Sequence, residues 1–190
     1  MELLEQRILK DGVVLPGNIL KVGSFLNHQI DFDFLLKLGA EIARRFSGEN
    51  ITKILTVEAS GIAIASAVAV HLHQPILFAK KSVSANIADT LYHTRVHSYT
   101  HGNDYDMVLE RAFLSENDRV LLVDDFLAVG EALGGLIALT QQAGASLVGC
   151  AIAIEKVFQG GGDRLRAQGV RVESLAMIES MDDHSLTFRK

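Results

Sequence analysis

Two adjacent aspartates, Asp124 and Asp125, directly follow the aliphatic run "VLLV" of residues 120–123. A buried strand has no structural reason to finish on two like charges. The loop "FLAVG" (126–130) comes next, and a pattern typical of a helix then runs to about Ala143. Ligands of open α/β sheets bind beside the carboxyl ends of the strands. We therefore interpret the two acids as ligand-binding groups at a strand end.

The loop that follows the acids suits an anion. The first turn of a helix offers unpaired backbone N–H groups and the positive end of the helix dipole. Ala128 and Gly130 are small enough to let that backbone approach a ligand closely. Carboxylates can accept sugar hydroxyls while the amides hold a phosphate, and each such charge-assisted hydrogen bond contributes about 1.5–3 kcal/mol. The pattern predicts a sugar phosphate as ligand.

Alternative roles for the acidic pair fit the sequence less well. One capping acid would be enough for an ordinary strand-to-helix turn, and two acids repel each other. In a phosphoacceptor receiver domain the pair ends the first strand and several strand–helix units follow, whereas here only residues 126–190 remain. The loop lacks the Gly-Lys-Ser/Thr of a nucleotide P-loop, and no strand-to-helix turn carries GxGxxG.

The elements that must position these groups alternate between strand and helix. An amphipathic helix opens the chain, and residues 13–30 indicate short extended pieces and turns. The predicted helices begin at Asp31 as N-cap, after "EASG" (58–61) and at about Gly130, and they end near 46, 73 and 143. The predicted strands are 52–57, 75–79, 90–100, 105–110, 119–125 and 146–156, with 101–104 as a hairpin turn. This order predicts one α/β domain over residues 1–190, with a mainly parallel twisted sheet flanked by helices.

The composition narrows the class of protein. The net charge of the 190 residues is 18 − 23 = −5, so no general nucleic-acid or anionic-membrane surface is expected. The longest apolar stretch, residues 61–70, is too short to span a bilayer, and the N-terminus does not resemble a signal peptide. Cys150 is the only cysteine and lies in an apolar run, which favours core packing over a role as nucleophile. We expect a cytoplasmic protein without nucleic-acid or membrane partners.

Three histidines raise the question of a metal site. His93, His97 and His101 recur at spacings of four, which on a helix would line one face. The segment is rich in Tyr, Thr and Val and is flanked by turn residues, so we interpret it as a strand. His93 and His97 would then lie about 13 Å apart at about 3.3 Å per residue, too far for one ion. We predict no protein metal site.

Three blocks of sequence resemble a known family. "VLLVDDFLAVGEA" (120–132) resembles the phosphoribosyl-pyrophosphate signature of the type I phosphoribosyltransferases. "ILKVGSFLNHQID" (19–31) and "IEKVFQ" (154–159) are similar to segments of the bacterial members that act on xanthine. The resemblance implies the type I phosphoribosyltransferase fold, with a small hood over the base formed by about 1–30 and 155–190. It also implies transfer of a phosphoribosyl group to xanthine, with release of pyrophosphate in purine salvage.

The resemblance assigns roles toward 5-phosphoribosyl-1-pyrophosphate. Asp124 and Asp125 would hold the ribose hydroxyls, and residues 82–104 would close over the reacting centre. The 5′-phosphate would lie on Ala128, Val129, Gly130, Glu131 and Ala132, and the pyrophosphate on Glu58, Ala59, Ser60 and Gly61, with positive charge added by Lys80 and Lys81. Mg²⁺ would arrive mainly with the pyrophosphate substrate, and a homodimer is implied. Without the resemblance, the two lysines could equally be a solvated pair that closes a strand.

Four residues are expected to contact the base. Lys156 follows a long apolar strand, where an ammonium is costly without an acceptor such as a purine oxygen. Phe158 can stack on a flat heterocycle, an interaction that contributes about 1–3 kcal/mol. Asn27 can donate its amide to O2, which distinguishes xanthine from hypoxanthine. Leu20 matches another base-contacting position. Without the resemblance, Asn27 would be a turn residue and Phe158 a core residue.

Some positions depart from the family pattern. Val129 replaces a Thr that many members carry, so backbone amides must hold the phosphate. Glu131 adds a negative charge near an anion unless it points outward, and Gly160 stands where Pro is expected. The basic run at Lys80 is shorter than expected. Two alternatives therefore stay open: the same chemistry on guanine or hypoxanthine, and a non-catalytic regulator that senses phosphoribosyl pyrophosphate.

Overall fold

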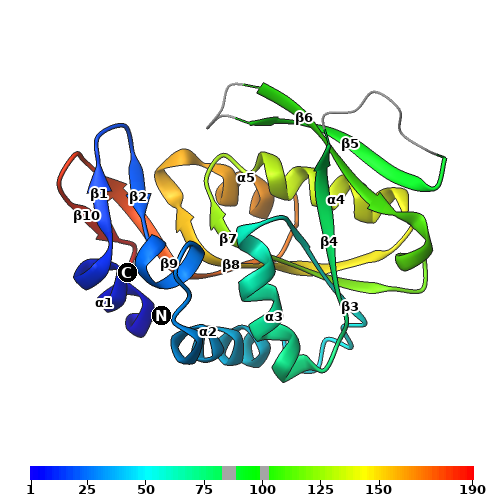
Figure 1. Cartoon of the computed structure of the whole chain (residues 1–190), viewed down its shortest axis with the longest axis horizontal. Coiled ribbons are helices and arrows are strands. Elements are labelled where there is room, and N and C mark those ends of the chain that lie inside the picture. The colour runs from blue at the N-terminus through cyan, green and yellow to red at the C-terminus, as the bar shows by residue number, and fades with distance from the viewer. Residues whose placement is uncertain (83–88, 99–102) are drawn as a thin grey trace.

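A central eight-stranded sheet organises the chain in the computed structural model, which describes residues 1–82, 89–98 and 103–190 (Figure 1). The strands of this sheet are β3 (Lys53–Val57), β4 (Ile76–Ser82), β5 (Leu91–Ser98), β6 (Asn103–Glu110), β7 (Arg119–Leu127), β8 (Ser146–Lys156), β9 (Val172–Met181) and β10 (Leu186–Phe188). Their order across the sheet is β10-β9-β8-β7-β3-β4-β6-β5. The predicted alternation of strands and helices produces this order because each helix carries the chain back to start a parallel neighbour.

The middle of the sheet is parallel and its edges are antiparallel. β4, β3, β7, β8 and β9 run parallel to one another. β6 turns back against β4 and pairs with β5, while β10 turns back against β9. The prediction of a mainly parallel α/β sheet with an antiparallel excursion is confirmed.

Helices cover both faces of the sheet. They are α1 (Glu2–Asp11), α2 (Phe32–Arg45), α3 (Ser60–Leu72), α4 (Glu131–Gln142) and α5 (Gly161–Ala167), with short helical turns at Gly23–Asn27, Arg111–Phe113 and Val157–Gln159. Side chains of α1, α2 and α3 share one hydrophobic cluster, and those of α4 and α5 share the other with β5 and β6. Figure 1 shows α2 and α3 on one side of the sheet and α4 and α5 on the other. In the described part of the chain, no helix is long and apolar enough to cross a membrane.

Local sequence explains where α2 begins and how it packs. The Asp31 carboxylate accepts a hydrogen bond from the N–H of Phe34 at 3.2 Å, so Asp31 is the predicted N-cap. Arg44 and Arg45 lie in the last turn, where positive charge is favourable. A Cβ on Gly39 would overlap the backbone of Ala67, so this glycine lets α2 and α3 approach closely.

The N-terminal segment folds onto the C-terminal strands. β1 (Val13–Leu15) and β2 (Ile19–Lys21) form a two-stranded antiparallel sheet, as expected from the extended pieces and turns. Residues 23–27 instead form one turn of π-helix, and this turn buries the side chains of Phe25 and Leu26 in the core. These two side chains share a hydrophobic cluster with Ile178 of β9. Whether this segment covers a base, as a hood would, stays a prediction.

The hairpin predicted at 90–110 is present. β5 and β6 pair from Leu91–Glu110 to Ser98–Asn103. The segment expected to close over the reacting centre, 82–104, lies partly outside the described residues, as do His101 and half of the predicted turn 101–104. β7 was predicted to end at the acids, and that boundary is wrong: Phe126 and Leu127 continue the strand because β8 pairs with them.

Candidate active site

The two aspartates lie where the sheet opens at its centre. β3 pairs with β7 only from Lys53–Val120 to Leu55–Leu122. Beyond that point β7 stays with β8, while the chain leaves β3 through residues 58–59 into α3. The chain proceeds from β3 to β4 on one side and from β7 to β8 on the other. The acids therefore lie at a topological switch point, the usual ligand position in such sheets.

The acidic pair is buried and ordered by hydrogen bonds. Asp124 and Asp125 are each only 6% exposed, and the N–H of Asp125 donates to Oδ1 of Asp124 at 3.0 Å. The Asp125 carboxylate also accepts from Oγ of Ser60 at 3.0 Å and from Nδ2 of Asn27 at 3.3 Å. Burial, and then the negative charge of Asp125, raise the pKa of Asp124 well above its usual value, with Lys81 acting in the opposite direction. Such a pair is suited to accept hydroxyl hydrogens from a ligand.

The segment after β3 supports the acids from one side. The Glu58 carboxylate accepts a hydrogen bond from the backbone N–H of Lys81 at 2.8 Å, and the Glu58–Ala59 peptide is cis. Ser60 begins α3 and contacts Asp125, as described above. A Cβ on Gly61 would overlap Oγ1 of Thr56 and lie 2.9 Å from Oδ1 of Asp124. Glycine at this position lets the first turn of α3 reach the acids.

The loop predicted to hold a phosphate lines a small cavity beside the acids. The volume of this cavity is about 240 Å³. The lining residues are Lys81, His97, Tyr105 and the whole run Phe126–Leu133. Gly130, at φ +86°, caps α4 in the left-handed region, which favours glycine. All five residues predicted for the 5′-phosphate therefore lie along one wall of one cavity.

The two lysines predicted to be near the pyrophosphate lie on different sides of β4. Lys81 lines the cavity of the phosphate loop, whereas Lys80 lines a separate hollow of about 550 Å³ with Phe78 and Phe113. Neighbouring residues of a strand point to opposite faces, so the two lysine side chains leave β4 in opposite directions. Lys81 is placed with the acids and Lys80 is not.

The residues predicted for the base lie beside β8 and the N-terminal segment. Nζ of Lys156 donates to the Asn18 carbonyl at 2.8 Å and lies 5.6 Å from the centroid of the Phe126 ring. Burial lowers the pKa of Lys156. Phe158 is 37% exposed and so retains a surface for stacking, while Leu20 is buried at 7%. The amide that Asn27 was predicted to give to a base is here given to Asp125.

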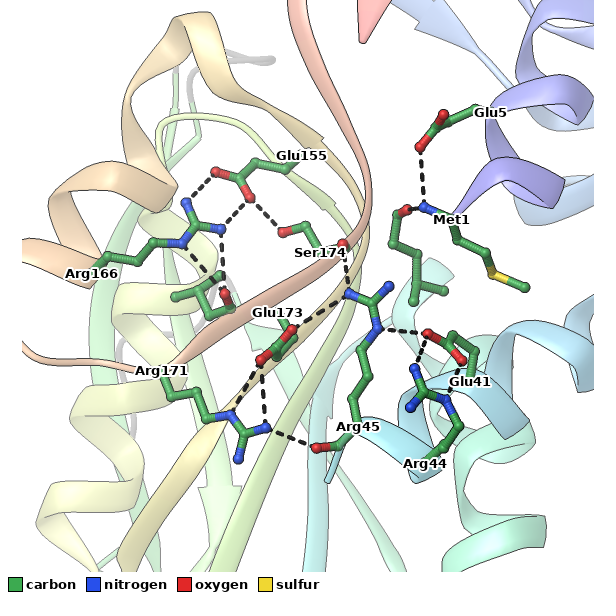
Figure 2. Close-up of polar contacts among 12 residues, drawn as sticks. Met1, Glu5, Glu41, Arg44, Arg45, Glu155, Arg166, Arg171, Glu173 and Ser174 are labelled. Atoms are coloured by element: carbon green, nitrogen blue, oxygen red, sulfur yellow. Dashed lines mark hydrogen bonds and ion pairs between the residues drawn. The ribbon is translucent and has the colours of Figure 1, made fainter. Parts of the chain in front are cut away.

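The loop that carries Phe158 is anchored by a buried ion pair (Figure 2). Glu155, the residue before Lys156, is fully buried, and both of its oxygens accept from Arg166 of α5, at 2.8 and 2.7 Å. The Ser174 hydroxyl donates to the same carboxylate. Gly160 ends the loop at φ +76°, which proline cannot adopt. The glycine that departs from the family pattern thus fits this particular loop conformation.

Two further residues of the cavity were not among the predicted ligand-binding residues, although one of them, His97, belongs to the segment 82–104 expected to close over the reacting centre. Tyr105 lies on β6 and His97 on β5, and both line the phosphate cavity. Burial, followed by the charges of Asp124 and Glu131, raises the pKa of Tyr105. The hairpin prediction alone placed these residues on strands, but their approach to the acids requires the register of β6 against β4.

Metal and thiol chemistry have few candidates among the described residues. Within residues 1–82, 89–98 and 103–190, no three His, Cys, Asp or Glu side chains are grouped to hold an ion. Asp124 and Asp125 offer carboxylate oxygens, the ligand type that suits Mg²⁺. Cys150 is fully buried, and burial raises the pKa of its thiol to about 12, as expected for a core residue.

Solved structures share this fold. APRTase from Giardia lamblia, complexed with 9-deazaadenine, superimposes with a TM-score of 0.79 at 18% identity, covering 94% of this chain and 98% of that chain. Adenine phosphoribosyltransferase from Rhodothermus marinus gives a TM-score of 0.75 at 22% identity, covering 93% and 98%. At these identities the likeness establishes the type I phosphoribosyltransferase fold alone.

Sequence relatives are much closer. The phosphoribosyl transferase domain family matches residues 24–175. Xanthine phosphoribosyltransferase from Lachnoclostridium phytofermentans is 50% identical over 191 residues, which cover 100% of this chain and 98% of that protein. The protein of the same name from Bacillus cereus is 50% identical over 188 residues, covering 99% and 95%. The chain therefore belongs to the type I phosphoribosyltransferase family, among its xanthine phosphoribosyltransferases.

Proposed function

We propose that this chain transfers the phosphoribosyl group of 5-phosphoribosyl-1-pyrophosphate to xanthine, giving xanthosine 5′-monophosphate and pyrophosphate. One observation carries the proposal: the buried pair Asp124 and Asp125 adjoins the cavity formed by residues 126–133. Carboxylates that accept hydroxyls and amides that hold a phosphate are together complementary to a pentose phosphate. The xanthine phosphoribosyltransferases that are 50% identical over the whole chain support the choice of reaction and base.

The proposed chemistry is a substitution at the anomeric carbon of the ribose. The C1–O bond to pyrophosphate breaks, a C1–N bond to a ring nitrogen of the base forms, and the proton of that nitrogen is released. Asp124 and Asp125 would fix the ribose hydroxyls, so that C1 lies between the base and the leaving group. Because an oxocarbenium-like centre needs little covalent help, positioning and charge stabilisation supply most of the acceleration.

The pyrophosphate is proposed to lie at the start of α3, near Lys81. Backbone N–H groups at Ser60 and Gly61 are in the first turn of that helix, where an anion is stabilised. Mg²⁺ would neutralise the charge that develops on the leaving group. The carboxylates of Asp124 and Asp125 could supply at most two of the oxygen ligands of this ion. The substrate would supply its other ligands.

The base is proposed to lie between the N-terminal segment and the loop after β8. Lys156 would donate to a purine oxygen, Asn27 to O2, and Phe158 would stack on the ring. Nζ of Lys156 donates to the Asn18 carbonyl, which places the ammonium beside the N-terminal segment. Because an ammonium has three N–H donors, it can keep this bond and still donate to a purine oxygen. Leu20 would contribute through packing.

Assembly and location are part of the same proposal. A homodimer follows from the family resemblance alone, and light scattering of the purified protein measures it. A cytoplasmic location fits a chain whose single cysteine, Cys150, is buried and needs no oxidising compartment.

Pyrophosphate release with each base tests the proposed reaction. Purified protein with Mg²⁺ and 5-phosphoribosyl-1-pyrophosphate is expected to release pyrophosphate fastest, at limiting base, with xanthine. A higher kcat/KM for guanine or hypoxanthine would contradict the choice of base. Binding of the sugar diphosphate without release for any of the three bases would instead indicate a regulator.

A further inference from the structure

Helix α5 contacts the loop predicted to bind the phosphate. The N–H of Gly161 donates to the Ala128 carbonyl at 3.2 Å, and Nη2 of Arg164 donates to the Val129 carbonyl at 2.5 Å. A Cβ on Gly161 would overlap the Ala128 oxygen and lie 2.6 Å from the Val129 carbonyl carbon, so the two segments touch backbone to backbone. Two successive carbonyls of the loop are therefore held by one short helix.

The direction of these carbonyls fixes the direction of the amides. A trans peptide is planar, and its N–H points opposite to its C=O. The carbonyls of Ala128 and Val129 point toward α5, so the N–H groups of Val129 and Gly130 point to the other side of the loop. Within the part of the chain that the structure describes, neither N–H has a hydrogen-bond acceptor. These two amides are available to a phosphate.

The same arginine lies beside the one acid of the loop. Nη2 of Arg164 is 4.0 Å from Oε1 of Glu131, and both side chains are partly exposed, at 52% and 38%. An exposed pair of this kind contributes little to folding stability. Near an anion site, however, an uncompensated Glu131 carboxylate would repel the ligand. Arg164 thus offsets the charge by which this loop departs from the family pattern.

We propose that Arg164 is a positioning residue of the phosphate loop. It holds the Val129 carbonyl on the side of α5, which aims the Gly130 amide at the phosphate, and it neutralises Glu131. The proposal builds on the proposed function, but it concerns a residue to which that function assigns no contact with a ligand. It requires Arg164 to act on phosphate affinity and leave the binding of the base unchanged.

Titration with ribose 5-phosphate tests this role without turnover. In Arg164→Met, calorimetry is expected to show a dissociation constant about tenfold higher, the lower end of the effect of losing a hydrogen bond to a charged group. The melting temperature is expected to fall by no more than about 4 °C, because the bond that is lost lies at the exposed surface. Arg44→Met removes an arginine that is 71% exposed and paired with Glu41, and it serves as the matched control with unchanged affinity. Affinity within twofold of wild type in Arg164→Met would overturn the proposal.

A double-mutant cycle with Glu131→Gln tests the role of charge. In the Glu131→Gln background no carboxylate needs to be offset, so Arg164→Met should raise the dissociation constant for ribose 5-phosphate by clearly less than tenfold. A loss of the same size in both backgrounds would overturn the role assigned to the Glu131 pair.

Steady-state kinetics separate local positioning from general disruption of α5. In Arg164→Met the KM for 5-phosphoribosyl-1-pyrophosphate should rise about tenfold while the KM for xanthine stays unchanged. An equal rise in both KM values would overturn the proposal, because α5 also follows the base loop. If wild-type protein binds ribose 5-phosphate but releases no pyrophosphate, the proposed function fails and the role of Arg164 is still decided by the titration.

Discussion

The Asn27 side-chain amide donates to the Asp125 carboxylate, with Nδ2 and Oδ2 3.3 Å apart. This bond joins the N-terminal segment to the end of β7, and thus a residue predicted for the base to a residue predicted for the ribose. Because the amide has two N–H donors, it can keep Asp125 and still offer one hydrogen to a ligand. Asn27 is therefore placed to align the two halves of the site.

Replacing Asn27 should reduce the discrimination between bases. In Asn27→Leu the donor for O2 is lost, while the volume of the side chain is nearly kept. We expect the ratio of kcat/KM for xanthine to that for hypoxanthine to fall about tenfold or more, since sites built on a hydrogen bond reject analogues that lack its partner. Asn117→Ala, at an exposed turn, is the control. An unchanged ratio would remove Asn27 from base recognition.

Lys156 should matter for the base and not for the sugar phosphate. In Lys156→Met the ammonium that now contacts the Asn18 carbonyl is absent. We expect kcat/KM for xanthine to fall by about 10–100-fold, from the loss of about 1.5–3 kcal/mol in a charge-assisted hydrogen bond. Affinity for ribose 5-phosphate should not change. Lys21→Met, on the exposed side of β2, controls for the loss of one charge, and a matching loss there would contradict the assignment.

Asp124 should lower the stability of the ligand-free protein as the pH rises. Burial, then Asp125, raise its pKa in the folded state above the value in the unfolded chain. When the pH is raised above about 4, the carboxyl therefore loses its proton in the unfolded state before it does so in the folded state. The free energy of unfolding decreases as the pH rises above this value. Asp124→Asn lacks this loss and should melt higher than wild type at pH 7, by about 2–4 °C for each kcal/mol relieved.

Melting curves of both proteins between pH 4 and pH 8 check this sign. The difference in melting temperature should shrink toward pH 4, because the carboxyl then begins to be protonated in the unfolded state as well. An Asp124→Asn protein that melts lower than wild type at pH 7 would show that the acid stabilises the fold, contrary to this account.

The pair of Glu155 and Arg166 should be required for folding stability. Arg166→Met would leave the fully buried Glu155 without its bidentate partner (Figure 2), and such a loss costs about 3–5 kcal/mol. Urea unfolding measures this change. Arg189→Met removes an exposed partner of Glu179 and should cost less than about 1 kcal/mol. Equal losses for the two variants would argue against the buried pair as the anchor of the base loop.

Sequence alone predicted those features of the fold that depend on residues close together in the chain. The strand–loop–helix around Asp124, the cap at Asp31 and the hairpin follow from periodicity and turn residues, and the structure confirms them. The separation of Lys80 from Lys81 is also a local effect, because neighbouring side chains of a strand point to opposite faces.

Contacts between distant segments were not predictable in the same way. The approach of Arg164 to Val129 depends on how α5 packs against the loop after β7, and that of Tyr105 to the phosphate cavity depends on how β6 pairs with β4. The continuation of β7 to Leu127 depends likewise on its partner β8. Tertiary packing decides all three, and no spacing in the chain encodes it.

The proposed binding of the ribose hydroxyls by Asp124 and Asp125 is tested most directly by replacing both residues. Ribose 5-phosphate is titrated calorimetrically into wild type and into the Asp124→Asn, Asp125→Asn double variant, with circular dichroism as the check that the fold is kept. Each carboxylate contributes about 1.5–3 kcal/mol in its hydrogen bonds, so binding should weaken by more than about 100-fold in the double variant. Retention of affinity within a few-fold of wild type would contradict the account.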